Sequence, residues 1–379
     1  MFNNIDLYNE PLSIYDKFSQ YKDYCEMSEF EQAFLCGMIK NAHPKKVVEI
    51  GVSAGGTTAV ILNCLAMLGE DVRMYSCDLN KTYYRDSSKP VGFVAEELKP
   101  YILDRESGQA KVNHTILSGG YAPEFLPEIG KDIDFLILDT VHWLPGEMLD
   151  FIACLPYLKK GATVVLHDVS MNVTINNDAI ATKFVFDTVV ADKYIMKTED
   201  RPCEFPNIAA FKITNDTYRY IRDCFSSLTI TWSYMPKPAE FKLYHEFYLT
   251  EYDKDLVEVY DKAVLLQIFI TCRNFKNMGI YWEVFLNKWR KAKHVIIYGC
   301  GLYGRYFYEL AKSYNLSIDC FVISDGRQAP DLGDVEAPVL NLSDVQFTPD
   351  ECLVLITVEK AAERSVINDL IRRGYTDIY

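Results

Sequence analysis

The sequence predicts an α/β protein with a Rossmann-like doubly wound domain, a helical connector and a smaller C-terminal Rossmann-like α/β domain. Short apolar runs alternate with helical stretches, and this alternation is typical of a parallel sheet covered by helices. The runs at 134–139 and 162–168 are nearly continuous in Val, Ile and Leu, as expected of strands buried on both faces. A glycine turn follows an apolar run twice, at Gly51 and at Gly299. We therefore divide the chain into four parts: 1–44, 45–235, 236–292 and 293–379.

The first part is predicted to be a helical segment. Residues 12–41 contain few helix-breaking residues and place Leu35, Met38 and Ile39 on one helical face. Pro44 then ends the segment. We expect residues 12–41 to be helical.

The second part is predicted to hold a parallel sheet. Its strands are expected at 47–52, 72–77, 111–117, 134–139 and 162–168. Its helices are expected at 57–68, 91–103, 122–129 and 146–158. Two further strands, 193–198 and 207–213, flank a turn at 199–206. We expect these two to form an antiparallel pair at the sheet edge.

The third and fourth parts differ in their sequence pattern. Residues 236–292 are rich in aromatic and charged residues at helical spacing and have no glycine before Gly279, which predicts a helical connector. The last domain is expected to consist of strand 294–299, helix 303–314, strands 317–324 and 352–358, and helix 361–373.

Composition and charge restrict the partners and the compartment. A net charge of −14 disfavours nucleic acid and anionic membranes. No segment reaches the roughly 20 apolar residues of a membrane span. The N-terminus lacks the basic and apolar regions of a secretory signal. The 11 scattered cysteines, without a C-x-x-C pair, favour reduced thiols over disulfides or a zinc site. These features predict a cytoplasmic protein.

The first glycine turn predicts a nucleoside site. Glu49, Gly51 and Gly55 form an E-x-G-x-x-x-G pattern between a strand and a helix. Glycine there lets the backbone turn tightly and approach a ligand. Asp78 ends the next strand, where a carboxylate can accept both ribose hydroxyls. The pattern leaves open another nucleotide or no ligand, and its lack of a second close glycine disfavours NAD.

Residues 45–213 resemble the class I S-adenosylmethionine-dependent methyltransferases, in the branch of catechol O-methyltransferase and the macrocin- and mycinamicin-type sugar O-methyltransferases. The resemblance depends on VVEIGVSAGG, YSCD, DFLILDTVHW and LPYLKKGATVVLHD, in that order. It implies S-adenosylmethionine as cofactor and Asp78 as its ribose ligand. Residues implied to line the cofactor are Glu49, Gly51, Ser53, Gly55 and Asp139. At the adenine side, Gly120 and Tyr121 stand where the family often has G-D-[SA], so Tyr121 is expected to flank the adenine.

Two acids and two histidines are expected to meet at one edge of the sheet. Asp139 and Asp168 end the fourth and fifth strands, and His142 and His167 lie beside them. If these strands are neighbours, their ends are about 5 Å apart. Two carboxylates at that distance repel by about 3 kcal/mol at an effective dielectric of about 20. A divalent cation or a shared proton would relieve this repulsion.

The chemistry at this edge has two interpretations. In the first, Asp139 and Asp168 bind Mg²⁺, which prefers oxygen ligands, and His142 removes the proton of an acceptor hydroxyl. The family pattern supports the two metal ligands, but catechol-type enzymes carry Asn after the second Asp, where this chain has Val169; Asn172 lies nearby in sequence. In the second interpretation no metal is needed, Asp139 contacts only the cofactor, and His142 or His167 suffices as the base.

The second glycine turn predicts a second nucleotide site. Gly299, Gly301 and Gly304 form G-x-G-x-x-G between a strand and a helix, and Asp325 ends the next strand. Residues 293–379 resemble the small nucleotide-sugar-binding domain that precedes many bacterial sugar acyltransferases. The alternative is a docking or assembly domain.

Three functions are compatible with these patterns. The first is O-methylation of a sugar, nucleotide sugar or glycan precursor. The second is methylation of an unrelated small molecule, with the C-terminal domain serving docking or a homo-oligomer. The third is a non-catalytic binding or scaffold protein, which the set of Glu49, Asp78, Asp139 and Asp168 disfavours.

Overall fold

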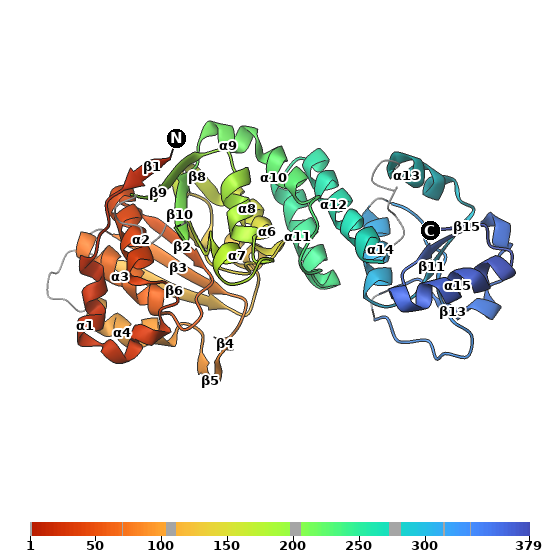
Figure 1. Ribbon diagram of the computed structural model, residues 1–379, viewed down its shortest axis with the longest axis horizontal. Helices are drawn as coiled ribbons and strands as arrows, with labels where there is room; N and C mark the ends of the chain where they lie inside the picture. Colours follow the sequence, from red (N-terminus) through yellow and green to blue (C-terminus); the bar gives the residue numbers. More distant parts are fainter. Residues whose placement is uncertain are drawn as a thin grey trace. The chain divides into compact units, whose positions relative to one another are not determined.

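The computed structural model describes residues 2–69, 71–103, 111–197, 206–272, 282–313, 315–333 and 335–379. The chain forms two compact units (Figure 1). Unit 1 comprises Met1–Ser227 and Trp232–Tyr234, and unit 2 comprises Leu228–Thr231 and Met235–Tyr379. Within the described residues, no helix is both long and apolar enough to cross a membrane.

Unit 1 is built on an eight-stranded sheet in the order β1-β9-β10-β8-β7-β2-β3-β6. Its strands are β1 (Asn3–Ile5), β2 (Lys46–Ile50), β3 (Val72–Asp78), β6 (Val112–Ser118), β7 (Ile133–Leu138), β8 (Leu158–His167), β9 (Asp192–Met196) and β10 (Ile208–Lys212). The five strands from β8 to β6 are mutually parallel, whereas β10 runs antiparallel to both β8 and β9. The predicted α/β fold and the predicted antiparallel pairing of β9 with β10 are therefore confirmed, but β1 lies outside this pair and forms the sheet edge.

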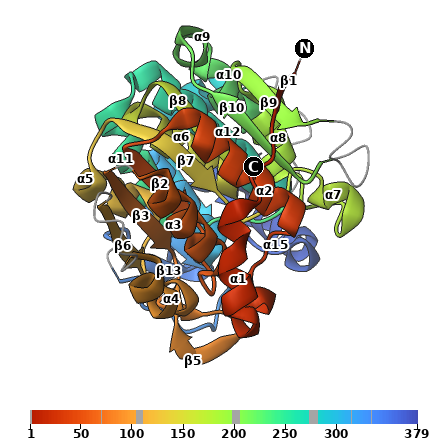
Figure 2. The same cartoon turned by 90° about the vertical axis from the view of Figure 1, so that its left-hand side faces the viewer.

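Helices cover both faces of this sheet. On one face lie α2 (Glu29–Ala42), α3 (Gly56–Leu68) and α4 (Phe93–Leu103), and Figure 2 shows α2 and α3 in front of the strands. On the other face lie α5 (Ala122–Ile129), α6 (Gly146–Cys154) and α8 (Ala181–Thr188). Shorter elements are α7 (Met171–Thr174), α9 (Asn215–Arg219), α10 (Ile221–Ser227), η3 (Leu155–Tyr157) and a hairpin of β4 (Thr82–Tyr83) and β5 (Asp86–Pro90).

The strand order places a binding edge between β2 and β7. From β2 the chain moves outward through β3 and β6, and then returns to the other side of β2 for β7 and β8. Ligands of open α/β sheets bind outside the carboxyl ends of the strands at such a reversal. Gly51 and Asp139 follow these two strands directly.

Residues 12–41, predicted to be helical, are divided among several helices. The chain forms η1 (Glu10–Ser13), α1 (Ile14–Lys17) and η2 (Ser19–Tyr24) before α2 begins. Ser28 caps α2, because its hydroxyl accepts from the Glu31 amide while the Glu31 carboxylate accepts from the Ser28 amide at 2.6 Å. This capping box starts a new helix. The turn predicted at 199–206 lies, except for its last residue, outside the described residues.

Unit 2 contains a smaller, fully parallel sheet in the order β13-β12-β11-β14-β15. Its strands are β11 (His294–Tyr298), β12 (Cys320–Ile323), β13 (Val339–Asn341), β14 (Cys352–Ile356) and β15 (Asp377–Ile378). Its helices are α11 (Pro238–Glu251), α12 (Lys254–Cys272), α13 (Trp282–Lys291), α14 (Leu302–Ser313) and α15 (Lys360–Arg372). The predicted smaller α/β domain is confirmed, although the short strands β13 and β15 were not predicted.

Candidate active site

The first glycine turn lies where the strand order of unit 1 reverses. Gly51 has a φ of +97°, and a Cβ atom there would lie 1.7 Å from the carbonyl oxygen of Asp139. Gly55 has a φ of +86°, and its Cβ would lie 2.8 Å from the Cα of Gly92. Both positions require glycine because no side chain fits the backbone angle or the space. The turn is thus held tightly between neighbouring backbones.

Asp78, the predicted ribose ligand, contacts this turn directly. Its Oδ2 accepts hydrogen bonds from the amides of Val52 and Ser53, both at 3.0 Å. Its Oδ1 accepts from the amide of Asn80 at 2.8 Å. The carboxylate expected at the ribose therefore also orients the residues expected at the methionine part of the cofactor.

Glu49 is buried beneath the turn. Its side chain is 2% exposed, and its Oε2 accepts from the Ser76 hydroxyl at 2.6 Å and the Thr58 hydroxyl at 2.9 Å. Burial raises the pKa of Glu49 to about 8, because the two hydroxyls only partly offset the loss of solvent. The structure gives Glu49 a position inside the protein, and its contact with a cofactor remains a prediction.

Gly120 and Tyr121 follow β6 at the same edge of the sheet. The Tyr121 amide donates to the Glu124 carboxylate at 2.7 Å. Gly120 is buried, and a Cβ there would lie 2.9 Å from the same carboxylate. Glu124 is an acidic group that the sequence analysis missed. An adenine contact of Tyr121 remains a prediction.

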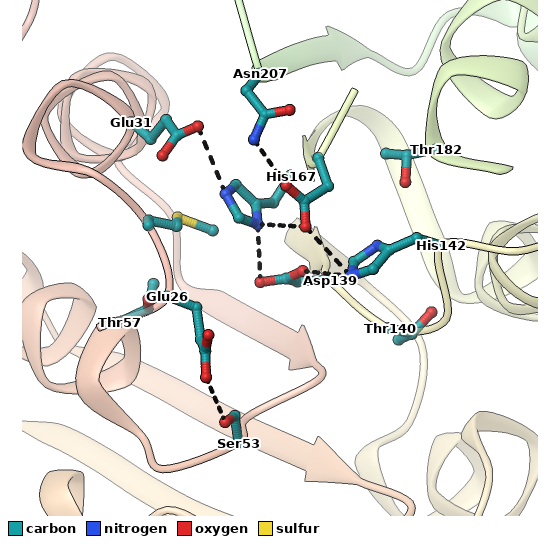
Figure 3. Close-up of polar contacts among 12 residues, drawn as sticks. Glu26, Glu31, Ser53, Thr57, Asp139, Thr140, His142, His167, Thr182 and Asn207 are labelled. Carbon is teal, nitrogen blue, oxygen red and sulfur yellow. Dashed lines mark hydrogen bonds and ion pairs between the residues drawn. The ribbon is translucent and has the colours of Figure 1, made fainter. Parts of the chain in front are cut away.

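The predicted acids and histidines lie together at the ends of β7 and β8 (Figure 3). His142 Nε2 lies 3.2 Å from Asp168 Oδ2 and 4.0 Å from Asp139 Oδ1. His167 Nδ1 lies 3.2 Å from Asp139 Oδ2 and 3.5 Å from Asp168 Oδ2. Each carboxylate therefore has imidazole partners, which reduce the repulsion expected between two bare acids.

Glu31 extends this cluster from the N-terminal segment. Its Oε1 lies 3.6 Å from His167 Nε2, so His167 is located between Glu31 and Asp139 (Figure 3). Burial alone would lower the pKa of His167, but Asp139 and Glu31 raise it well above its usual range. Burial alone would likewise raise the pKa of Glu31, but His167 lowers it to about 2. The acids on both sides of His167 thus favour its protonated form.

Asn207 contacts Asp168, the second aspartate of the cluster. Its amide nitrogen donates to Asp168 Oδ1 at 2.7 Å, and its carbonyl oxygen accepts from the Ser170 amide at 3.1 Å. Asp168 itself has a left-handed φ of +61°. Asn172, which the sequence suggested as a partner of Asp168, does not hold this place; Asn207 does.

Glu147 supports His142 from α6. Its Oε1 lies 3.5 Å from His142 Nδ1, and its Oε2 accepts from the Thr182 hydroxyl. Burial alone would lower the pKa of His142, but Glu147, Asp139 and Asp168 raise it to about 9. Glu147 is fully buried. The Nε2 atom of His142 is thereby directed to the two aspartates.

Asp139, His142 and Asp168 also form a group that could hold a metal ion. Their potential ligand atoms all lie within 4.8 Å of one another, and each residue is partly exposed. Two carboxylate oxygens and one imidazole nitrogen can bind a divalent cation, and the carboxylates are ligands that suit Mg²⁺.

The second glycine turn lacks such a cluster among the described residues. Gly299 has a φ of +108° and faces Thr357. A Cβ atom added to Gly304 would lie 2.1 Å from the Gly299 carbonyl oxygen and would clash with it. Only Gly301 has open space beside it, with no atom within 4 Å of an added Cβ. Asp325 accepts from the Ser343 amide at 2.7 Å and pairs with Arg373 at 2.6 Å. The predicted site residues share one sheet edge, but their acid is already bound to other groups.

Comparison with known proteins places the methyltransferase pattern on unit 1. Residues 48–169 match a family model described as a methyltransferase domain. The domain contains Asp78, Asp139, His142, His167 and Asp168. No curated protein matches the sequence.

Solved structures similar to the chain include three methyltransferases. One is an O-methyltransferase of Streptomyces achromogenes involved in tomaymycin synthesis, in complex with SAM (15% identity, 54% of this chain and 88% of that chain, TM-score 0.36). Another is an O-methyltransferase of Bacillus cereus in complex with SAH (13%, 53% and 90%, TM-score 0.37). A third is the SAH-bound methyltransferase PaMTH1 of Podospora anserina (11%, 56% and 91%, TM-score 0.36).

The class that the fold and the matched domain define is the S-adenosylmethionine-dependent methyltransferases. The predicted enzyme class is therefore confirmed. The family model ends at residue 169, so it does not extend to unit 2.

Proposed function

We propose that the protein transfers the methyl group of S-adenosylmethionine to a hydroxyl oxygen of a small molecule. The observation that carries this proposal is the position of two histidines and two carboxylates directly beside the glycine turn. Gly51 contacts the backbone of Asp139, and the side chain of Asp139 faces His167 and His142. In the transfer, an oxygen lone pair forms the new O–CH₃ bond while the C–S bond breaks and its electrons return to sulfur.

His142 is the proposed base for the acceptor proton. Glu147 holds its Nδ1 side, and the Nε2 side faces the aspartates. An imidazole must be neutral to accept a proton. The positive sulfonium of the cofactor would favour this neutral form, because a nearby positive charge disfavours imidazolium. His167 is more deeply buried, with 4% of its side chain exposed, and it is better suited to holding Asp139 and Asp168.

Asp139 and Asp168 are the proposed ligands of Mg²⁺. A bound cation would lower the pKa of an acceptor hydroxyl. The residues present fit this group, since the two carboxylates are close and partly exposed. In the metal-free alternative, orientation of the acceptor beside His142 or His167 provides the catalysis.

For the acceptor we propose a sugar, a nucleotide sugar or a glycan precursor. The support is the second strand–glycine turn–helix arrangement in unit 2, where Gly301 leaves open space in front of α14. A nucleotide sugar would place its diphosphate at this turn, since helix N-termini attract phosphate. The proposed role of Asp325 is to contact the ribose, for which it would have to exchange its present partners.

The test is formation of S-adenosylhomocysteine from S-adenosylmethionine with a panel of sugars, nucleotide sugars and phenols. His142→Asn should lower the maximal rate about a hundredfold or more, because the base is lost. The matched control is His43→Asn, since His43 is exposed at the end of α2 and its left-handed φ of +47° tolerates Asn. Equal rates for His142→Asn and the control would remove His142 from the reaction.

Removal of metal separates the two mechanisms. If Asp139 and Asp168 hold Mg²⁺, exhaustive chelation abolishes turnover and added Mg²⁺ restores it. Unchanged turnover after chelation would assign the site to the metal-free alternative.

A further inference from the structure

Two segments that are far apart in the sequence converge on Ser53 in the first glycine turn. One is the stretch that precedes α2, and it contributes Glu26. The other is the β4–β5 hairpin, which contributes Arg85. Glu26 Oε1 accepts from the Ser53 hydroxyl at 3.1 Å, and Glu26 Oε2 accepts from Arg85 Nη2 at 2.9 Å. Figure 3 shows Glu26 pointing at Ser53.

Buried backbone contacts, rather than this ion pair, fix the two segments. A Cβ on Gly56 would lie 2.4 Å from the carbonyl oxygen of Tyr24, and the Tyr15 hydroxyl donates to the Gly56 carbonyl at 2.6 Å. On the hairpin side, the Gly92 amide donates to the Ser53 carbonyl at 2.9 Å. The position of an acid and a base at Ser53 is therefore built into the fold.

The pair itself is exposed and easily opened. The side chains of Arg85 and Glu26 are 54% and 32% exposed. Exposed ion pairs contribute little to stability, so separating these two charges costs little. The Tyr84 hydroxyl donates to Glu26 Oε1, the oxygen that also accepts from Ser53, at 3.2 Å, and the Arg85 guanidinium lies 5.0 Å from the Tyr84 ring centroid. The fold gives no structural need for this pair, but the turn beside it is the predicted position of the cofactor's methionine part.

We propose that Glu26 and Arg85 bind the amino-acid end of S-adenosylmethionine. This inference rests on the proposed function. The amino-acid end carries an ammonium and a carboxylate, and Glu26 and Arg85 offer one charge of the opposite sign to each. Glu26 would accept from the ammonium, and Arg85 would donate to the carboxylate, with both charges strengthening the hydrogen bonds. On binding, the ligand's ammonium thus replaces Arg85 as the partner of Glu26. Its carboxylate replaces Glu26 as the partner of Arg85.

The negative charge of the protein favours a cation at this position. With a net charge of −14, and with Asp78 and Asp139 beside the turn, the surroundings repel a carboxylate. A local cation must offset this repulsion. Lys89 is also on the hairpin, but its Nζ is held by the Tyr24 hydroxyl at 3.1 Å and lies 4.4 Å from the Phe93 ring centroid. Arg85 is therefore the hairpin cation that reaches the turn through Glu26.

The test is calorimetry with four ligands on the full-length protein. They are S-adenosylhomocysteine, its deaminated analogue, its decarboxylated analogue, and 5′-methylthioadenosine, which lacks both groups. Glu26→Gln should weaken S-adenosylhomocysteine about tenfold or more, as expected for a lost charged hydrogen bond. It should change the deaminated analogue little. Arg85→Met should weaken binding of the ligands that keep the carboxylate, which are S-adenosylhomocysteine and its deaminated analogue. It should change binding of the decarboxylated analogue little.

Two matched variants serve as controls. Glu29→Gln removes a nearby acid at the start of α2, where Glu29 pairs with Lys22 at 2.6 Å, and Lys89→Met removes a cation from the same hairpin. Neither should change the preference among the four ligands. Equal weakening of all four ligands by Glu26→Gln and Arg85→Met would overturn the proposal, because it would show that the pair only closes the turn. Unchanged binding would also overturn it. If the wild type binds neither S-adenosylmethionine nor S-adenosylhomocysteine, the cofactor assignment fails, and this proposal fails with it.

Discussion

The two glycine turns share a backbone design but differ in the groups around them. Gly51 and Gly299 follow the central strands β2 and β11, with φ values of +97° and +108°. Each contacts the residue that follows a neighbouring strand. In unit 1 that residue is Asp139, whose carboxylate faces two histidines. In unit 2 it is Thr357, whose hydroxyl donates to the Gly299 carbonyl at 2.8 Å.

The next strand shows the same contrast. Asp78 accepts from two amides of its own glycine turn. Asp325 instead binds Ser343 and Arg373, and it has no recorded bond to the second turn within the described residues. A strand–glycine–helix arrangement therefore defines the shape of a nucleotide fold, whereas the residues at the strand ends decide what chemistry it can do. This comparison predicts different sensitivities of the two turns.

The largest expected difference is in the free energy of unfolding of Gly51→Ala and Gly301→Ala. The first places a Cβ 1.7 Å from a carbonyl oxygen at a positive φ, so it should destabilise the protein by more than about 4 kcal/mol. The second meets no atom within 4 Å, so it should change stability by less than about 1 kcal/mol. Denaturant unfolding measures both. A mild effect of Gly51→Ala would show that the first turn is looser than described.

A smaller difference, in the pH dependence of stability, is expected from the buried residues two positions before Gly51 and Gly299. Unit 1 has Glu49 there, and unit 2 has Ile297. The pKa of Glu49 is raised from 4.5 to about 8, so the folded state binds its proton more tightly than the unfolded state. The stability from this group is complete below pH 4.5 and is lost as pH rises through 8. Glu49→Gln should thus flatten the pH dependence of the melting temperature and stabilise the protein relative to wild type at pH 9, not at pH 4. Parallel melting curves for both proteins would contradict the burial of a titrating carboxylate.

The smallest expected effect is that of nucleotide sugars on unit 2. If the second turn binds one, a ligand at 100 times its dissociation constant stabilises the folded state by about 2.7 kcal/mol. The melting of the full-length protein should be followed with UDP-, GDP-, CDP- and dTDP-sugars, with Asp325→Ala as the variant that loses the effect. If no sugar nucleotide moves the melting temperature, unit 2 is better described as a docking domain.

The sequence predicted the longer strands of both sheets because buried parallel strands leave continuous apolar runs, as in β7 and β8, whereas the short strands β1, β13 and β15 were not predicted. The N-terminal segment is helical as predicted, but its division before α2 was not predicted, although Ser28 and Glu31 form a visible capping signal. Asn207 could not be predicted as a partner of Asp168. It reaches Asp168 only because β10 pairs with β8, where Ile208 stands opposite His167.

The roles of Glu31 and Glu147 were missed for a similar reason. Both are buried acids on helices, and helical spacing alone describes them as ordinary polar residues. Their contacts with His167 and His142 depend on how α2 and α6 pack on opposite faces of the sheet. Local patterns thus indicated the residues at the strand ends but not the groups that hold them.

The most direct test of the account is calorimetry of S-adenosylmethionine and S-adenosylhomocysteine with wild type, Asp78→Asn and Asp325→Asn. Asn keeps an oxygen that can accept from the Val52 and Ser53 amides, so the first turn should persist while the charged contact to ribose is lost. We expect Asp325→Asn to bind each ligand as tightly as wild type does. Asp78→Asn should bind each ligand about tenfold or more weakly than wild type. Equal binding by Asp78→Asn, or weakening by Asp325→Asn instead, would contradict the assignment of the cofactor to the first glycine turn.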